Sequence, residues 1–406
     1  MTVEIVVLGA GYGGAAAIDS LEGELGDNED VSLTWISNED YHFLLHESHR
    51  LIREASVREG ITVPIEEIIT EETNFVQGEV TDVDVDDRTI GLAADSSIEY
   101  DLLVVCLGSK TAFFGIDGLE EHALTLKSLE DAMAISERIR AAADDATEGE
   151  PAQVLVGGAG LTGIQTAGEI AAYRSEADAP IDVYLIERSE TIFPGHDHEF
   201  QGAIRNKLED HDVDIRTNTV ISAVDDSTVE LESGDEMDYD VLIWAGGITG
   251  QDALGLADLP KDHNRVYTGA TLETDDDRVF ALGDTALMDQ DEQESPLSEE
   301  AIWEAIVDPD VGNQAPPTAE AAMEAGEVLG ENVARKLRGE ELIHWTYTDK
   351  GTLVSVGDEA IAHGVLGAPI NTFSGPAART LKKAISARWL AKISGPRRVL
   401  RAWSDM

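Results

Sequence analysis

Two stretches of the chain share one order of apolar, small and helix-forming residues. Each opens with a short apolar run, at 4–8 and at 153–156, and passes through glycines into a segment with helical spacing. A short β-branched run bounded by turn residues is typical of a strand buried in a parallel sheet. The pattern therefore predicts two strand–turn–helix units, and with them an α/β fold built on parallel sheets.

The glycines of both units follow the spacing Gly-x-Gly-x-x-Gly. They are Gly9, Gly11 and Gly14 in the first unit, which also has Gly13 within the motif, and Gly158, Gly160 and Gly163 in the second. The first glycine of such a motif permits a tight turn, the second lets backbone approach a pyrophosphate, and the third lets the helix pack on the strand. The helix N-terminus then attracts the phosphates. Because each motif lies between a strand and a helix, we predict two Rossmann-like dinucleotide-binding domains.

The residue that ends the next strand of each unit indicates which dinucleotide binds. Glu187 lies 24 residues beyond the last glycine of the second motif, where a carboxylate can accept hydrogen bonds from a ribose 2′-OH. This favours NADH over NADPH, whereas Arg188 offers an alternative partner for a 2′-phosphate. In the first unit Ser37 stands at the equivalent position, and Glu39 is the nearby acid.

Three further predicted strands end in glycine. The stretches 104–109 and 242–247 are typical of crossovers between two such domains, and the strand predicted within 279–286 ends on a Gly-Asp pair. The glycines are Gly108, Gly246 and Gly283. The carboxylate of Asp284 can hold the ribityl hydroxyls of a flavin. These pieces oppose the alternative of a duplicated fold with one inactive site.

Together these motifs resemble the two-dinucleotide-binding flavoprotein family and, within it, the type II NADH dehydrogenases, over nearly the whole chain. The most specific stretches are 108–132, 157–169, 243–248 and 347–357. The resemblance implies a glutathione-reductase-like fold with three regions. These are an FAD-binding domain (1–110 and 240–335), an NAD(H)-binding domain (111–239) and a C-terminal α+β region that associates with membrane (336–406).

The same resemblance implies the chemistry. Non-covalent FAD takes hydride from NADH and passes two electrons to a membrane quinone, menaquinone or similar, without proton pumping. The family usually has Glu where this chain has Gln165, a position associated with the nicotinamide and quinone region. Glu169, one helical turn on, is an alternative contributor or a structural helix acid.

The expected quinone region also departs from the family pattern. Family members carry Gln residues in the stretch that is TAEAAMEAG (318–326) here, and this chain has Glu320 and Glu324 instead. A buried carboxylate could donate a proton to quinone, and a surface acid is the equal alternative. Lys350 is a candidate for stabilising negative charge on the reduced flavin or for orienting quinone, with an ordinary loop lysine as the alternative.

Composition narrows the partners and the setting. The chain has 81 acidic and 28 basic residues and a net charge of −53, which argues against nucleic acid as a partner. Scarce Lys among abundant acids is typical of a halophilic protein, and a mesophile with an acidic surface is the alternative. The single cysteine, Cys106, excludes a dithiol centre and disfavours sulfide:quinone chemistry.

The C-terminal segment has the opposite charge. Residues 376–406 contain eight Lys or Arg and one acid. On a helical wheel its apolar residues form one broad face, interrupted by basic residues, and a second cluster after Pro396. The face comprises Leu381, Ile385, Trp389 and Ile393, and the cluster Val399, Leu400 and Trp403. In the resembled family such tails lie on the membrane, so we expect contact with anionic headgroups. Docking on the protein's own acidic body, or on a second subunit, is the alternative.

The remaining expectations concern location and lesser features. We find no signal-peptide pattern and no apolar run that could span a membrane, and we expect a cytoplasmic enzyme peripheral on the inner face of the cell membrane. Homodimerisation stays open, and no metal site is expected from His42, His46 and His49 despite their helical spacing. The acidic stretch 288–314 is expected to be a loop with one helical turn, and 81–87 a surface hairpin. Other functions left open are a soluble NADH-dependent flavoprotein with another acceptor and a redox-sensing interaction module.

Overall fold

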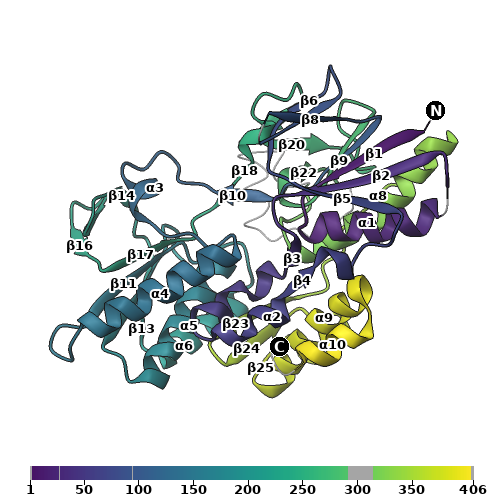
Figure 1. Ribbon diagram of the computed structural model, residues 1–406. Coiled ribbons are helices and arrows are strands. Elements are labelled where there is room, and N and C mark those ends of the chain that lie inside the picture. The colour runs from purple at the N-terminus through teal and green to yellow at the C-terminus, as the bar shows by residue number, and fades with distance from the viewer. Residues whose placement is uncertain (1, 27, 94, 291–313, 404–406) are drawn as a thin grey trace.

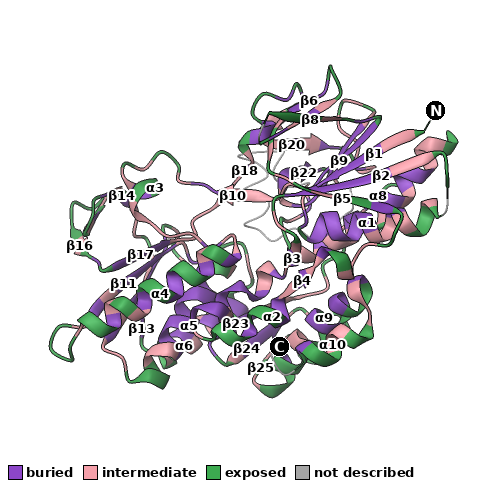
Figure 2. Ribbon diagram, in the orientation of Figure 1, coloured by how far each residue is buried: buried purple, intermediate pink, exposed green. Residues whose placement is uncertain are grey.

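The chain folds around two parallel sheets, as the apolar pattern predicts. The computed structural model describes residues 2–26, 28–93, 95–290 and 314–403 (Figure 1). The first sheet has the order β21-β9-β1-β2-β5 and the second β13-β12-β11-β17, with every pairing parallel. Figure 2 shows that the strands of both sheets are largely buried, except for the edge strands β5 and β13.

The first sheet lies beside a pair of helices. Its strands are β1 (Val3–Leu8), β2 (Val31–Ser37), β5 (Thr73–Gln77), β9 (Leu102–Val105) and β21 (Val279–Ala281). Helices α1 (Tyr12–Leu25) and α8 (Ala319–Arg338) run side by side against it (Figure 1). They pack closely because Gly326 and Gly330 of α8 face Ala16 and Ser20 of α1, with no side chain between the two backbones.

The second sheet is covered by three helices. Its strands are β11 (Ala152–Gly157), β12 (Ile181–Ile186), β13 (Val213–Arg216) and β17 (Val241–Trp244), and its helices α4 (Leu129–Asp145), α5 (Leu161–Ala177) and α6 (His198–Asp210). A capping box starts α4, in which Ser128 and Asp131 bond each other's backbone N–H groups. A small antiparallel sheet of β14 (Ile221–Val224), β15 (Thr228–Leu231) and β16 (Glu236–Asp238) adjoins this half.

Two short antiparallel strands join the halves. They are β10 (Ser109–Thr111), which follows β9, and β18 (Ile248–Gly250), which follows β17. This confirms crossovers at the two glycine-ended strands. The expected boundary at residue 240 falls too early, however, because β17 pairs with β11 in the second sheet and the chain crosses back only after Trp244.

Smaller elements complete the first half. The expected hairpin at 81–87 is confirmed by β6 (Val80–Asp84) and β7 (Thr89–Leu92), which pair with β8 (Ser96–Glu99). The others are β3 (Tyr41–Phe43), β4 (Thr62–Pro64), α2 (Arg58–Ile61), β19 (Lys261–Asp262), β20 (Arg265–Thr268), β22 (Ala286–Met288), η1 (Leu45–Ile52), η2 (Ala55–Val57), η3 (Ile65–Glu67), η4 (Asp252–Leu254) and η5 (Gly283–Thr285). The short helix α3 (Leu119–His122) lies in the second half, beside β14. The expected helical turn within 288–314 lies outside the described residues.

The C-terminal region is an α+β unit, as expected. Strands β23 (Thr352–Val356), β24 (Glu359–His363) and β25 (Thr372–Ser374) form an antiparallel sheet, followed by α9 (Pro376–Ser394) and α10 (Pro396–Ala402). Both helices dock on the body of the protein (yellow in Figure 1). Among the described helices, none is long and apolar enough to cross a membrane.

The docked tail divides the apolar face expected from the helical wheel. Trp389 and Ile393 are buried against the body, whereas Ile385 is 41% exposed. Basic side chains of the tail pair with acids of the body, Lys392 with Glu327 and Arg398 with Glu67. Trp389 and Ile393 therefore face the protein, not a membrane as expected, and Ile385 stays exposed because α9 turns a narrower stripe toward the body.

Candidate active site

The first glycine motif forms the turn between β1 and α1. Gly9 has φ +94°, and a Cβ there would collide with the Cys106 carbonyl oxygen of the neighbouring strand end. A Cβ on Gly14 would collide with the Gly9 carbonyl oxygen. Gly11, by contrast, has no atom within 4 Å of a Cβ position apart from those of its two chain neighbours, so this face of the turn is open. Gly13 faces Leu282 and serves packing in this arrangement.

The second motif repeats this geometry between β11 and α5. Gly158 has φ +95° and lies against Ala245 and Gly246, and a Cβ on Gly163 would collide with the Gly158 carbonyl oxygen. Gly160 is open like Gly11. Gly246 therefore supports the second glycine turn from the end of β17.

Both turns fit a dinucleotide phosphate. Gly11 and Gly160 are the N-caps of α1 and α5, and neither helix receives a side-chain cap bond. The first N–H groups of each helix therefore point to an open face without an intrahelical acceptor, which suits an anion. The structure brings each turn to the carboxyl end of its parallel sheet, where ligands bind in such folds.

The strand ends beyond the turns carry the expected ribose-binding positions. Glu187 is buried at the end of β12, and its carboxylate accepts hydrogen bonds from Ala159 N and Ser189 N, each at 2.8 Å. It thus braces the second glycine turn and keeps further lone pairs for a ligand. Arg188 is exposed. Ser37 is buried at the end of β2, and its hydroxyl accepts from Glu39 N at 3.3 Å.

A polar cluster forms where β9 and β21 end. Asp284 Oδ2 accepts a hydrogen bond from Ser109 Oγ at 2.8 Å, and Lys127 Nζ donates to that same Oγ at 2.9 Å. Lys127 Nζ also lies 3.9 Å from Asp284 Oδ2. Burial lowers the pKa of Lys127, and the charge of Asp284 opposes that shift. Gly108 and Gly283, next to this cluster, have φ of +69° and +74°.

Lys127 was missed in the sequence. It lies in the stretch 108–132, one of those that carry the family resemblance, yet no local motif singles it out. Its partners Ser109 and Asp284 lie 18 and 157 residues away along the chain. The scarcity of Lys was the one usable signal.

The helix after the second glycine turn holds Gln165 and Glu169 in the interior. Gln165 is 5% exposed. Glu169 Oε2 accepts from Arg53 Nε at 2.8 Å, and Arg53 also binds Glu176 and Asp358. Burial raises the pKa of Glu169 and Arg53 opposes that shift. The ion pair ties α5 to η1 and to the β23–β24 turn, which favours the structural role for Glu169.

The first two turns of α8 bring Glu320 and Glu324 to Lys350. Lys350 Nζ binds Glu324 and lies 3.3 Å from Glu320 Oε1. A Cβ on Gly283 would lie 3.4 Å from Ala322 of the same helix. Glu320 and Glu324 lie two residues before and two residues after Ala322, so they project from a different side of α8, where both are paired with Lys350. Burial, followed by Glu320, raises the pKa of the neighbouring Tyr347 to about 12.

The histidines do not form a metal centre in the described parts of the chain, where no group of three or more His, Cys, Asp or Glu could hold a metal ion. The expected helical spacing is wrong for His42, which lies on β3, while His46 and His49 lie on η1. Cys106 is buried, and burial raises the pKa of its thiol well above the usual range.

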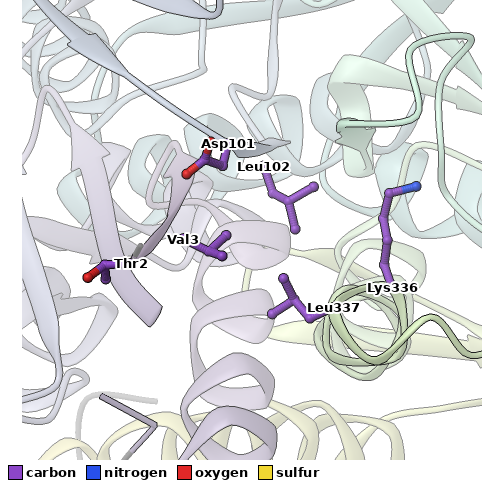
Figure 3. Close-up of a pocket in the computed structure, with 6 residues that line it drawn as sticks. All are labelled: Thr2, Val3, Asp101, Leu102, Lys336 and Leu337. Carbon is purple, nitrogen blue, oxygen red and sulfur yellow. The ribbon is translucent and has the colours of Figure 1, made fainter. Parts of the chain in front are cut away.

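A cavity of about 510 Å³ lies at the amino ends of the strands of the first sheet, the edge opposite the glycine turn (Figure 3). It is lined by Thr2, Val3, Asp101, Leu102, Lys336 and Leu337. These residues come from the amino ends of β1 and β9 and from the last turn of α8. The cavity is thus remote from both glycine turns and does not belong to the site.

Comparison with known proteins agrees with this geometry. The chain is similar to type II NADH:quinone oxidoreductase of Staphylococcus aureus (strain NCTC 8325 / PS 47), 27% identical over 409 residues and covering 97% of this chain and 96% of the relative. Two solved structures share the fold at 17% identity. They are NDH2 from Plasmodium falciparum in complex with NADH (TM-score 0.80, 100% of this chain, 98% of that chain) and the sulfide:quinone oxidoreductase from Aquifex aeolicus (TM-score 0.76, 97% and 92%).

The family model described as pyridine nucleotide-disulphide oxidoreductase matches residues 3–326, which span both glycine turns, both crossovers and the start of α8. With both parallel sheets and both nucleotide turns in place, the chain belongs to the pyridine nucleotide-disulphide oxidoreductase family.

Proposed function

We propose that this protein is a single-chain NADH:quinone oxidoreductase with FAD as its bound cofactor. The observation that carries the proposal is the pair of open glycine turns, each at the carboxyl end of its own parallel sheet within one chain. Similarity to a type II NADH:quinone oxidoreductase along 97% of the chain supports the same reading. When bound, FAD supplies the redox chemistry, taking hydride from NADH and passing two electrons to the quinone.

Residues of the first half hold FAD in this proposal. The open turn at Gly11 receives the pyrophosphate, and Asp284 accepts hydrogen bonds from ribityl hydroxyls. Ser109 and Lys127 orient that carboxylate, because both lie within reach of it. Ser37 occupies the ribose end of the first turn.

Residues of the second half bind NADH. The turn at Gly160 receives its pyrophosphate, and Glu187 accepts from the adenosine ribose. A 2′-phosphate would meet the buried carboxylate of Glu187 at short range, which favours NADH over NADPH. Gln165, buried on α5 just after that turn, can hydrogen-bond a ligand without taking a proton.

The quinone end lies at the first turn of α8. Lys350 offers N–H donors to a quinone oxygen, while Glu320 and Glu324 hold the ammonium group in place. A carboxyl group at this position, when protonated, could also donate one of the two protons that the quinone takes up as it is reduced to hydroquinone. The single buried thiol of Cys106 argues against the sulfide:quinone alternative, which needs redox cysteines.

We further propose that the enzyme lies peripherally on the cytoplasmic face of the membrane. Support comes from exposed apolar side chains on the C-terminal region, namely Leu366, Ile370, Ile385, Leu400 and Trp403, close in sequence to exposed basic residues. The tail's contacts with the body occupy Lys382, Lys392 and Arg398, and they leave Arg388 and Arg397 exposed.

Anaerobic rapid mixing tests the proposal. The FAD-loaded protein is reduced with NADH at high salt and then mixed with a soluble menaquinone analogue while flavin absorbance is followed. Rapid bleaching and rapid recovery are expected. Bleaching without recovery would keep the NADH site, reject quinone as the acceptor and direct attention to a protein acceptor or a redox-sensing role.

A further inference from the structure

Helix α9 reaches the first glycine turn through a buried histidine. Trp389 Nε1 donates to His42 Nε2 at 2.9 Å, and His42 Nδ1 lies 2.8 Å from the Ala10 carbonyl oxygen. An indole N–H can only donate, so His42 Nε2 is the acceptor and Nδ1 carries the hydrogen that bonds Ala10. His42 is completely buried, and burial lowers its pKa to about 4, which keeps this neutral tautomer in place.

A second histidine makes a parallel connection. His46 binds the Tyr12 hydroxyl through Nδ1 and Ser386 Oγ through Nε2, the latter at 2.8 Å. Ser386 donates its one hydrogen to Glu47 Oε1 at 3.0 Å, so it must accept from His46 Nε2–H. His46 Nδ1 then accepts the hydrogen of Tyr12. The bonds run in one direction, from the glycine turn to α9 and on to a buried carboxylate.

A lysine of α9 also balances the charge of Glu47, the carboxylate on which this series of hydrogen bonds ends. Glu47 is 4% exposed, and Lys382 Nζ lies 3.6 Å from its Oε2. Lys382 also donates to Ser355 Oγ at 2.7 Å and lies 3.2 Å from His49 Nε2. Removing α9 would take Lys382 and Ser386 from the buried Glu47 carboxylate, which would keep only His46 and Arg50 nearby, and would take one partner from each of the three histidines, which is costly.

The two connections end on the residues on either side of Gly11, the open point of the turn. Tyr12 also packs edge-on against His42 at 5.0 Å and lies 5.7 Å from Trp389, measured between ring centroids. Ala10 and Tyr12 thus take their positions from α9, a helix more than 360 residues away along the chain.

We propose that α9 is a working part of the FAD site, with His42, His46, Ser386 and Trp389 as positioning residues, so that docking of α9 and binding of FAD stabilise each other. The proposal rests on the placement of FAD at the first glycine turn given above. Reciprocity is required thermodynamically, since a helix that favours the FAD-binding form of the turn is itself favoured by FAD.

Substitutions on α9 test the coupling by direct FAD titration of the deflavinated full-length protein. W389F keeps an aromatic ring and removes the N–H, and S386A removes the hydroxyl. We expect each to weaken FAD binding about tenfold, because a buried polar group loses its partner. R388A, an exposed position between the two, is the matched control and is expected to stay within twofold of the wild type.

A further variant, D284N, separates this proposal from the one on which it rests. If D284N weakens FAD binding while W389F and S386A match R388A, the coupling is overturned and the placement of FAD stands. If D284N has no effect on FAD affinity, the placement of FAD fails, and the coupling fails with it.

The unmodified protein gives an independent test that does not depend on a variant folding. Hydrogen exchange is followed in the full chain with and without FAD. We expect FAD to slow exchange of the α9 amides about tenfold and the α6 amides, in the second half, much less. Equal α9 rates in both states would show that the tail only stabilises the fold, and would overturn the proposal.

Discussion

Lys127 is the residue whose role depends most on distant partners. Its ammonium group lies 3.9 Å from Asp284 and bonds Ser109, in the cluster that we assign to the ribityl chain. Replacing it with Met removes the cation and the donor from a mostly buried position. We expect Lys127→Met to weaken FAD binding about tenfold, measured by flavin fluorescence titration.

The control for this prediction is Lys110→Met. Lys110 pairs with Asp252, which is 79% exposed, so that ion pair lies in water and contributes little. Equal effects of the two substitutions on FAD affinity would contradict a role for Lys127 in the site.

The Glu187 side chain has two proposed roles: it braces the second glycine turn and it selects NADH over NADPH. Glu187→Gln removes the negative charge. Its one carbonyl oxygen can replace only one of the two carboxylate oxygens that accept hydrogen bonds from Ala159 N and Ser189 N. We expect kcat/KM for NADH to fall about tenfold and the preference for NADH over NADPH to shrink. Arg188→Ala, at the exposed neighbouring position, is expected to leave NADH kinetics unchanged. An unaltered NADH/NADPH ratio in the Gln variant would count against Glu187 as the ribose acceptor.

His42 predicts a particular pH dependence of stability. Its pKa is lowered to about 4 in the folded protein, so between about pH 6.5 and pH 4 the unfolded chain binds a proton that the folded chain does not. Stability therefore falls as pH decreases through this window, by roughly 3 kcal/mol for this group. We expect the free energy of unfolding of His42→Asn, measured by chemical denaturation at high salt, to fall less between pH 7 and pH 4.5 than that of the wild type.

The comparison with His42→Asn is needed because protonation of surface acids also reduces self-repulsion over this range. Both proteins share that effect and the contribution of His49, whose pKa is likewise lowered by burial. Parallel pH profiles for the two proteins would contradict the neutral buried form of His42.

At the scale of elements, the close contact between helices α1 and α8 joins two segments of the first half that are distant in sequence. A Cβ on Gly326 would lie 2.5 Å from Ala16 Cβ and 2.9 Å from the Gly13 carbonyl oxygen. We expect Gly326→Ala to lower the free energy of unfolding by about 2 kcal/mol, because the helices must separate. Chemical denaturation provides the measurement.

Gly23, on the exposed side of α1, offers a control of opposite sign. Outside the backbone of α1 and its chain neighbours, no atom lies within 4 Å of a Cβ position on Gly23, so Gly23→Ala is expected to raise stability by about 0.5–1 kcal/mol through helix propensity. If both substitutions changed stability in the same direction, close α1–α8 packing would not be the cause.

At the scale of the molecule, the net charge of −53 predicts a need for salt. At about 1 M salt the Debye length is roughly 3 Å, so repulsion among surface acids is screened. We expect the thermal midpoint to rise on the order of 5 °C between 0.1 M and 2 M KCl, equivalent to a few kcal/mol in a chain of this size. A midpoint independent of salt would favour an ordinary acidic surface over a halophilic one.

The tail shows how charge and burial combine at this scale. Lys382 meets Glu47 inside the protein, where salt screens little, whereas Lys392 and Glu327 pair at the surface. The basic segment thus has partners within the chain itself, and it still leaves basic and apolar side chains exposed on α9 and α10 for a second surface.

The fold class and both glycine turns could be predicted because their information is local. A strand, a positive-φ glycine and a helix start lie within about ten residues, and their geometry follows from sterics at Gly9 and Gly158. The resemblance to a two-dinucleotide family is confirmed by the match over residues 3–326. The residue roles within the turns stay predictions, to be tested as described.

The pairings between distant side chains were decided by tertiary structure alone. Arg53 holds Glu169 116 residues away, and Trp389 binds His42 347 residues away. Helical periodicity showed that α9 has an apolar side, but not that Trp389 and Ile393 would be covered while Ile385 stayed exposed. By itself the sequence determined where the chain turns and which stretches are strands and helices, because these follow from local backbone sterics and apolar spacing. Which charges and hydrogen-bonding groups meet was determined only when the packed sheets and helices brought remote segments within a few ångströms.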